Sequence, residues 1–268
     1  MGYIRITGVS NPQIRQALNI KNRRSRHKHS AFLIEGPHLI EMALASRTRL
    51  KKIFFTGTFQ TKKEAPGLLR NLAKKTGEIF EVADHIISRL TDTETPQGIL
   101  AVVSYQPLPI EELHLKGGNL FAVIDGIQDP GNLGTIIRTA DAAGAGAVIL
   151  LPGTSDAFMP KAIRSTAGSI FNIPIVYADV ATLISWLGDR KIKLLVTAVD
   201  AETSLYEADL KGPLAMVFGN EAHGACGLLK KAADLLLNIP IYGKAESLNV
   251  AASAAICLYE VVRQRKSD

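Results

Sequence analysis

The sequence has few cysteines, no long apolar run and no internal repeat or low-complexity tract. Its two cysteines, Cys226 and Cys257, lack CxxC spacing and are too few for a disulfide framework. No apolar run approaches the roughly 20 residues of a membrane-spanning helix, and the first residues lack the apolar stretch of a secretory signal. These absences argue against a disulfide-stabilised secreted domain and an integral membrane protein, and they favour a reduced, cytoplasmic setting.

Charged residues are also sparse, at 21%, whereas hydrophobic residues make up 47% of the 268. That balance is typical of a folded globular protein, and the length suits two small hydrophobic cores. The net charge of +6 is unevenly divided: residues 1–105 carry 17 basic and 8 acidic side chains, and residues 106–268 carry 14 and 17. A basic half favours a module that binds nucleic acid, although excess charge can also serve solubility alone.

The basic half shows alternating strand and helix signals. Asn11 and Pro12 suit the cap and the first position of a helix. After it, strands are predicted at 31–36, 51–57, 77–83 and 96–103, and helices at 38–45, 64–76 and 85–92. The alternation predicts a compact α/β domain over residues 1–104. A dense basic cluster follows the first helix, and its candidate RNA-binding residues are Arg23, Arg24, Arg26 and Lys28.

Residues 105–118 contain two prolines and a glycine pair, and they are predicted to form a linker to a second domain over 119–268. In that domain, continuous apolar runs predict strands at 120–124, 147–150, 173–176, 193–198, 214–218 and 235–239. The clearest helices between and after them are predicted at 133–143, 181–187 and 249–265. Such runs are typical of a parallel sheet covered on both faces.

Three loops of the second half carry polar residues where strands end. In the first, an Asp-Pro-Gly-Asn turn follows the strand ending at Ile124, and Asn132 is predicted to cap the next helix. Leu133 and Ile136 mark the apolar face of that helix. Arg138 lies roughly 140° from this face. It therefore points toward solvent, a ligand or a partner, and solvent is the ordinary choice for one exposed arginine.

The second loop follows the strand 214–218 and includes Gly219, Glu221 and Gly224. Glycine lets a ligand approach the backbone closely, and Glu221 offers a carboxylate at a strand end. His223 and Cys226 raise the idea of a zinc site, but the sequence has no second pair of ligands. We therefore predict no bound metal.

The third loop joins the last strand to the last helix. The strand ends at Ile239–Pro240, and Ser247, Leu248 and Asn249 lead into the helix. Taken alone, Ser247 and Asn249 could serve only as helix caps. Small residues at the start of this helix permit close packing against a neighbour.

Together the three loops resemble the three motifs of the SpoU/TrmH family in the SPOUT methyltransferase superfamily, over about residues 118–268. The residues that carry the resemblance are Asn132, Gly134 and Arg138, then Phe218–Glu221 and Gly224, then Ile239–Ile241 and Ser247–Ala251. Residues 11–36, with the Pro-Gln-Gly at 96–98, resemble the small substrate-binding domain of such enzymes, which is similar to a ribosomal RNA-binding fold.

The resemblance implies an α/β protein whose C-terminal parallel-sheet domain is tied in a trefoil knot, and it implies a homodimer. It also implies transfer of a methyl group from S-adenosylmethionine to a ribose 2′-hydroxyl of structured RNA without a metal. By position, the residues that contact the cofactor are Gly219, Ile239, Leu248 and, more weakly, Ala198. The implied catalytic set is Asn132, Arg138, Glu221, Ser247 and Asn249. The additional basic domain favours ribosomal RNA as substrate.

Methyl transfer from a sulfonium is an in-line displacement, so the protein must orient the hydroxyl and assist loss of its proton. Because a guanidinium stays protonated near neutral pH, we expect Arg138 to hold a phosphate and stabilise the developing oxyanion, not to act as a base. Two alternatives remain from the sequence. One is a non-catalytic RNA-binding factor for ribosome assembly, and the other is a tRNA methyltransferase.

Overall fold

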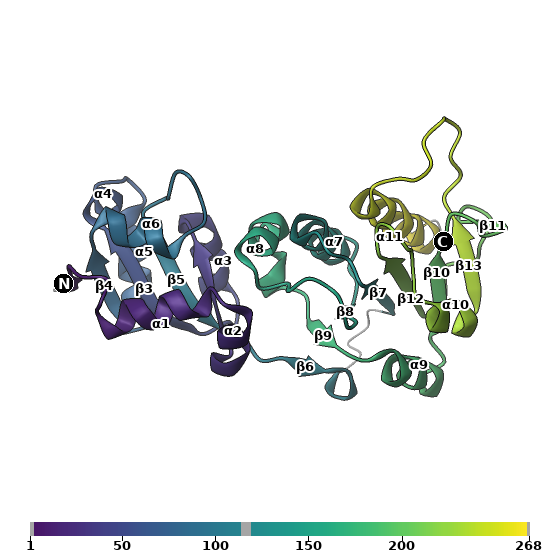
Figure 1. Ribbon diagram of the computed structural model, residues 1–268, viewed down its shortest axis with the longest axis horizontal. Helices are drawn as coiled ribbons and strands as arrows, with labels where there is room; N and C mark the ends of the chain where they lie inside the picture. Colours follow the sequence, from purple (N-terminus) through teal and green to yellow (C-terminus); the bar gives the residue numbers. More distant parts are fainter. Residues whose placement is uncertain (1–2, 114–118, 267–268) are drawn as a thin grey trace. The chain divides into compact units, whose positions relative to one another are not determined.

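The computed structural model describes residues 3–113 and 119–266 (Figure 1). The chain divides into two compact units. The first contains the described residues up to Gln106 together with Phe158–Phe171, and the second contains Pro107–Ala157 and the described chain from Asn172 onward. Each unit has its own β-sheet, which confirms the α/β prediction for both halves.

The first unit contains a mixed five-stranded sheet in the order β1-β4-β3-β5-β2. The strands are β1 (Ile4–Ile6), β2 (Ala31–Glu35), β3 (Leu50–Thr56), β4 (Ile79–Val82) and β5 (Ile99–Ser104). Its helices are α1 (Pro12–Ile20), α2 (Arg23–His29), α3 (Pro37–Ala45), α4 (Gly57–Gln60), α5 (Ala65–Ala73), α6 (Asp84–Leu90), α8 (Pro160–Thr166) and the 3₁₀ turn η2 (Ser169–Phe171). Apolar residues of α1 and α6 pack with those of β2 to β5 in one core.

The basic cluster forms helix α2, which the sequence pattern does not predict. Asn11 caps α1 by accepting from the Gln13 N–H at 2.9 Å, as expected, and Asn22 caps α2 through the Arg24 N–H at 2.9 Å. Because α2 has no apolar stripe, periodicity gives no signal for it. The short helix is instead bounded by its two caps, Asn22 at the N-terminal end and Ser30, in the left-handed conformation, at the C-terminal end.

Arg26 of α2 is buried, with only 3% of its surface exposed. One guanidinium nitrogen donates to the carbonyl of Ile20 at 3.2 Å and to that of Lys21 at 2.6 Å. These carbonyls lie at the end of α1, where a helix leaves acceptors without partners in its own backbone. The prediction that Arg26 contacts RNA is therefore wrong, because its charge satisfies the protein's own backbone.

The segment Phe158–Phe171 belongs by its contacts to the first unit, although its sequence position lies inside the predicted second domain. The Phe158 ring stacks on that of Tyr105 with centroids 4.0 Å apart and lies 5.0 Å from that of Phe32. These three aromatic rings form one cluster. The sequence predicted a boundary by composition alone, and composition does not report such a long-range contact.

The second unit contains an eight-stranded sheet in the order β11-β13-β10-β12-β7-β8-β9-β6, and every pairing in it is parallel. Its strands are β6 (Leu108–Pro109), β7 (Leu120–Asp125), β8 (Ala147–Leu150), β9 (Ile175–Tyr177), β10 (Lys193–Thr197), β11 (Thr203–Ser204), β12 (Leu214–Gly219) and β13 (Leu235–Asn238). Its helices are η1 (Ile110–Glu112), α7 (Pro130–Ala142), α9 (Val180–Asp189), α10 (Gly227–Ala232) and α11 (Val250–Lys266). The parallel sheet predicted from continuous apolar runs is confirmed.

Helices cover both faces of this sheet. Side chains of η1, α9 and α10 join one core cluster with alternate residues of β7, β10 and β12. Helices α7 and α11 contact each other, and α11 packs on β12, on the opposite face (Figure 1). The central strands β7 and β12 are fully buried, which explains why they lack the polar alternation of a sheet with one solvated face.

Part of the predicted linker is folded. Residues 107–113 add β6 to the edge of the sheet and form η1, and Ile110 and Leu113 are buried in the core of the second unit. Residues 114–118 of the predicted linker lie outside the described residues. Within the described chain, no helix combines the length and apolar character needed to cross a membrane.

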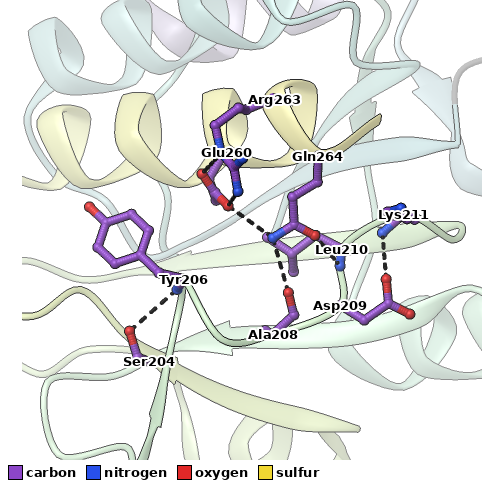
Figure 2. A network of polar contacts seen from close by, with 9 residues as sticks. All are labelled: Ser204, Tyr206, Ala208, Asp209, Leu210, Lys211, Glu260, Arg263 and Gln264. Atoms are coloured by element: carbon purple, nitrogen blue, oxygen red, sulfur yellow. Dashed lines mark hydrogen bonds and ion pairs between the residues drawn. The ribbon is translucent and has the colours of Figure 1, made fainter. Parts of the chain in front are cut away.

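Helix α11 is held at its C-terminal end by a polar network (Figure 2). Gln264 donates to the Ala208 carbonyl at 3.0 Å and accepts from the Leu210 N–H at 3.0 Å. Glu260, which is buried, accepts from Gln264 at 2.9 Å and from Arg263 at 2.7 Å. The hydrogen bond from Arg263 is the main cause that lowers the pKa of Glu260. The network fixes the helix whose other end begins at the candidate active site.

Candidate active site

The three polar loops lie near one another because of the sheet order. Strands β7 and β12 are adjacent and parallel, with Ile124 beside Phe218 and Asp125 beside Gly219 at their ends. Strand β10 lies next to β12, and β13 pairs with β10 in the same direction. Because parallel strands end at the same edge of a sheet, the loops after β7, β12 and β13 emerge together, where ligands bind in sheets of this kind.

Asp129, not Asn132, caps helix α7. The Asp129 carboxylate accepts from the Asn132 N–H at 2.8 Å, and Pro130 occupies the first helical position. Proline is favoured there because it has no N–H to leave unsatisfied, so the cap is the residue before it. The prediction of Asn132 as the cap is therefore wrong by three positions. Its side chain is consequently available to other groups.

The side chains of Asn132, Glu221 and Asn249 form one hydrogen-bonded chain, which we call the amide–carboxylate cluster. The Asn132 amide donates to a Glu221 carboxylate oxygen at 3.1 Å. Its carbonyl oxygen accepts from the Asn249 amide at 3.1 Å. Asn249 also caps α11, since its oxygen accepts from the Ala251 N–H at 2.9 Å. The cluster brings together residues from all three loops and fixes the orientation of the Asn132 amide.

Glu221 is held as a carboxylate. Partial burial alone would raise its pKa, but hydrogen bonds from its own N–H, the Asn132 amide and the Gln128 N–H outweigh burial, so the pKa is lowered. The Gln128 N–H lies 3.3 Å from the second carboxylate oxygen. A carboxylate with a lowered pKa is a poor proton acceptor and a good hydrogen-bond acceptor. Glu221 therefore orients its neighbours and is poorly suited to act as a general base.

The turn after β12 brings two backbone segments into direct contact. A Cβ atom placed on Gly219 would lie 2.1 Å from the Ala225 nitrogen and 2.2 Å from the Gly224 carbonyl carbon. Gly224 has a φ of +68°, and its N–H and carbonyl bond to the backbone of Asn220 at 2.8 and 3.0 Å. Only glycine fits at position 219, because the obstacle is backbone that has no side chain to move.

Two further residues fix this turn against β7. The Asn220 amide donates to the Gly126 carbonyl at 2.8 Å. The buried Asp125 carboxylate accepts from the Cys226 N–H at 2.6 Å, at the start of α10. Neither Asp125 nor Gln128 was selected from the sequence. The predicted strand ended at Ile124, one residue before Asp125. Gln128 reaches Glu221 through its backbone N–H, a contact that the residue type does not signal.

A cleft of about 690 Å³ opens beside the amide–carboxylate cluster. All four residues predicted to contact the cofactor line it, namely Ala198, Gly219, Ile239 and Leu248. Glu221, Ser247 and Asn249 line it as well. The volume is in the range of small-molecule and cofactor sites. In the described parts of the chain, no group of three or more His, Cys, Asp or Glu residues is arranged to hold a metal ion.

Arg138 is not part of the cluster in this chain. It is exposed on α7, six residues beyond Asn132, which corresponds to about 9 Å along a helix. Within residues 3–113 and 119–266 it forms no hydrogen bond or ion pair. Ser247 lines the cleft but has no hydrogen bond to another described residue. The geometry thus groups three of the five predicted catalytic residues, places Ser247 nearby and leaves Arg138 outside.

The family model described as the SpoU rRNA methylase family matches residues 119–259, which is more than half of the chain. The chain belongs to the SpoU rRNA methylase family. In this SpoU methylase, a second model, the MRM3-like substrate binding domain, matches residues 11–101. The family membership expected from the three motifs is confirmed.

Full-length relatives agree with both matches. The SpoU methylase is 38% identical to the 23S rRNA (guanosine(2553)-2'-O)-methyltransferase RlmP of Bacillus subtilis (strain 168), over 96% of this chain and 98% of that protein. It is 31% identical to the 23S rRNA (uridine(2479)-2'-O)-methyltransferase of Streptomyces viridochromogenes, over 94% and 89%. The crystal structure of the SpoU methyltransferase AviRb from S. viridochromogenes, in complex with AdoMet, matches with a TM-score of 0.89 at 30% identity, over 96% and 99%.

Proposed function

We propose that this chain transfers a methyl group from S-adenosylmethionine to a ribose 2′-hydroxyl of ribosomal RNA. The observation that carries the proposal is the amide–carboxylate cluster of Asn132, Glu221 and Asn249 at the edge of a cofactor-sized cleft. The names of the relatives support the reaction, since both curated relatives are 23S rRNA 2′-O-methyltransferases and AviRb was crystallised with AdoMet.

The residues at the cleft fit S-adenosylmethionine. Gly219 and Leu248 line the cleft from two different loops, and the Leu248 side chain is 38% exposed. Ala198 and Ile239 complete the proposed cofactor contacts. When bound, the cofactor supplies a sulfonium methyl group that is already activated by its positive charge. The protein's task is then to align the ribose hydroxyl and to exclude competing orientations.

The amide–carboxylate cluster provides that alignment. Glu221 remains ionised and holds the Asn132 amide through its N–H, while Asn249 holds the amide oxygen from the other side. Asn132 therefore presents fixed polar atoms toward the ribose without needing to reorganise during the reaction. Ser247, on the same loop as Asn249, is proposed to contact the ribose or its phosphate. The ionised Glu221 is assigned an orienting role.

Arg138 is proposed to act across a homodimer. It lies exposed and without an ion pair among the described residues, away from the cluster of its own chain. Its positive charge would stabilise the oxyanion and bind a phosphate if it entered the site of a second copy. We also propose the trefoil knot that the three motifs imply. A cytoplasmic location is likewise proposed, in keeping with the 23S rRNA substrates in the names of the relatives.

The reaction is tested with ribosomal RNA from cells that lack the enzyme and with S-adenosylmethionine labelled in its methyl group. Alkali cannot cleave next to a 2′-O-methyl ribose, so the label should appear in alkali-resistant dinucleotides. Label in free mononucleotides would indicate base methylation and contradict the proposal. Transfer to tRNA but not ribosomal RNA would favour the tRNA alternative, and RNA binding without transfer would favour the assembly factor.

Replacing Arg23, Arg24 and Lys28 by Gln should weaken RNA binding and make it less salt-dependent. All three are exposed on α2, and each phosphate contact contributes about 0.7 to 0.9 to the slope of log affinity against log salt concentration. We expect the slope to fall by about 2 in a filter-binding titration. Replacement of Lys63, Lys74 and Lys75, also exposed in the first unit, is the matched control. Equal losses in both variants would refute a specific role for α2.

Asn132→Asp should lower methyl transfer by about 10- to 100-fold, the equivalent of one charge-assisted hydrogen bond. The substitution replaces the amide N–H that donates to Glu221 by a second carboxylate. Because two adjacent negative charges repel each other, the pKa of this pair of carboxyl groups rises. As pH falls through that raised pKa, one carboxyl regains a proton to donate, so the ratio of variant to wild-type rate should rise. Asn132→Ala cannot recover in this way. A pH-independent ratio for Asn132→Asp would contradict the assigned role.

A further inference from the structure

Tyr242 is the most exposed large hydrophobic residue in the described part of the chain, with 92% of its surface in solvent. The next values are 69% for Val199 and 66% for Leu228. No hydrogen bond or ring contact joins the Tyr242 side chain to another described residue. Its aromatic ring therefore stabilises nothing within this chain, and its faces are free for a ligand.

Tyr242 directly follows a residue that lines the cleft. It belongs to the loop between β13 and α11, which projects from the sheet in Figure 1. Ile241 on one side of it lines the cleft, and so do the residues from Glu246 to Asn249 on the other. Both ends of the loop thus border the candidate active site, and residues 242–249 are exposed.

The neighbours of Tyr242 suit an RNA strand. No atom would lie within 4 Å of a Cβ on Gly243, so the backbone beside the ring is open. Lys244 places an exposed positive charge two residues after the ring. An aromatic face next to a cation is the usual means of binding unpaired bases, with the base stacked on the ring and the phosphate near the charge.

We propose that Tyr242 stacks on an unpaired base next to the nucleotide that is methylated, and that it thereby positions the target ribose. This inference rests on the proposed function and deepens it, because it requires the substrate to be splayed, single-stranded RNA at this point. A ribose in a regular helix presents its 2′-hydroxyl in the minor groove, whereas a base held on Tyr242 would draw the ribose toward Asn132 and Glu221. Tyr242 touches the substrate but not the reacting atoms.

Steady-state methyl transfer to ribosomal RNA from cells lacking the enzyme tests the proposal. Tyr242→Ala should lower kcat/KM for RNA by about tenfold or more, mainly through KM. Tyr242→Phe and Tyr242→Trp should retain activity because they keep an aromatic face. Affinity for S-adenosylmethionine, measured by calorimetry, should not change. Tyr206→Ala is the matched control, since Tyr206 is 51% exposed, lies outside the cleft and points its ring away from the network in Figure 2.

The other outcomes contradict either the stacking inference or the proposed function, and they can be told apart. An unchanged kcat/KM in Tyr242→Ala, with an active wild-type enzyme, overturns the stacking inference and leaves the proposed function intact. Weaker binding of S-adenosylmethionine means that the ring contacts the cofactor, and a loss of dimer by sedimentation means that it contacts a second copy; either result overturns the inference. A wild-type protein that transfers no methyl group to RNA rejects the proposed function itself.

Discussion

Arg138→Ala should reduce methyl transfer to ribosomal RNA by about 100- to 1,000-fold, the loss typical of removing one group that stabilises an oxyanion. The affinity for S-adenosylmethionine should remain nearly unchanged, because Arg138 lies outside the cleft of its own chain. Folding should also be unaffected, since the side chain is exposed and forms no hydrogen bond within the described residues. The measurements are single-turnover methyl transfer, calorimetric cofactor titration and thermal unfolding.

Two further variants separate charge from geometry at this position. Arg138→Lys keeps the positive charge but loses the planar fork of donors, so it should recover only part of the activity. Arg70→Ala removes another exposed helical arginine, in the first unit, and should leave transfer intact. A large loss of cofactor affinity in Arg138→Ala would count against its assignment to the oxyanion. Mixing Arg138→Ala with Asn132→Ala should restore some activity if the arginine acts on a second copy.

Gly219→Ala should lower methyl transfer by a different route. The added Cβ would lie 2.1 Å from the Ala225 nitrogen, so the turn after β12 must move. We expect a loss of about 1 to 3 kcal/mol in the free energy of unfolding. Because the same turn positions Glu221, we also expect roughly a 100-fold loss of transfer even where the protein folds. Cofactor affinity should fall too, in contrast to Arg138→Ala.

Gly227→Ala is the matched control for Gly219→Ala. Gly227 opens α10 a few residues later, and nothing lies within 4 Å of the position its Cβ would occupy. Alanine also favours the helical conformation over glycine. This variant should therefore be at least as stable as the wild type and fully active. If Gly219→Ala behaved like Gly227→Ala in chemical denaturation and cofactor titration, the close backbone approach would not be required.

The sequence predicts the parallel sheet well because buried strands require continuous apolar runs, which are visible residue by residue. It predicts the site in outline, because a strand end followed by polar and glycine residues is a local pattern. It misses what depends on spatial neighbours. Arg26 looks like its basic neighbours in sequence, yet it binds two carbonyls at the end of α1. Gln128 contacts Glu221 through its backbone N–H, and the residue type carries no signal for that contact.

The Asn132 error has a more specific cause. Both Asp129 and Asn132 can cap a helix, and the predicted start at Leu133 followed the apolar periodicity and ignored Pro130. Had Asn132 been the cap, its side chain would have been occupied by backbone N–H groups. Its freedom to pair with Glu221 and Asn249 depends on Asp129 taking that role. A single turn residue thus decides whether a neighbour serves structure or chemistry.

The segment Phe158–Phe171 bears on how such proteins can be divided and recombined. Because it belongs to the first unit while lying between two stretches of the second, the chain passes from one unit to the other at three points in sequence. Expression of residues after 106 alone would leave Phe158 without Tyr105 and Phe32, exposing an aromatic surface prone to aggregation. A chimaera that exchanges the first unit must therefore replace two separate pieces of sequence.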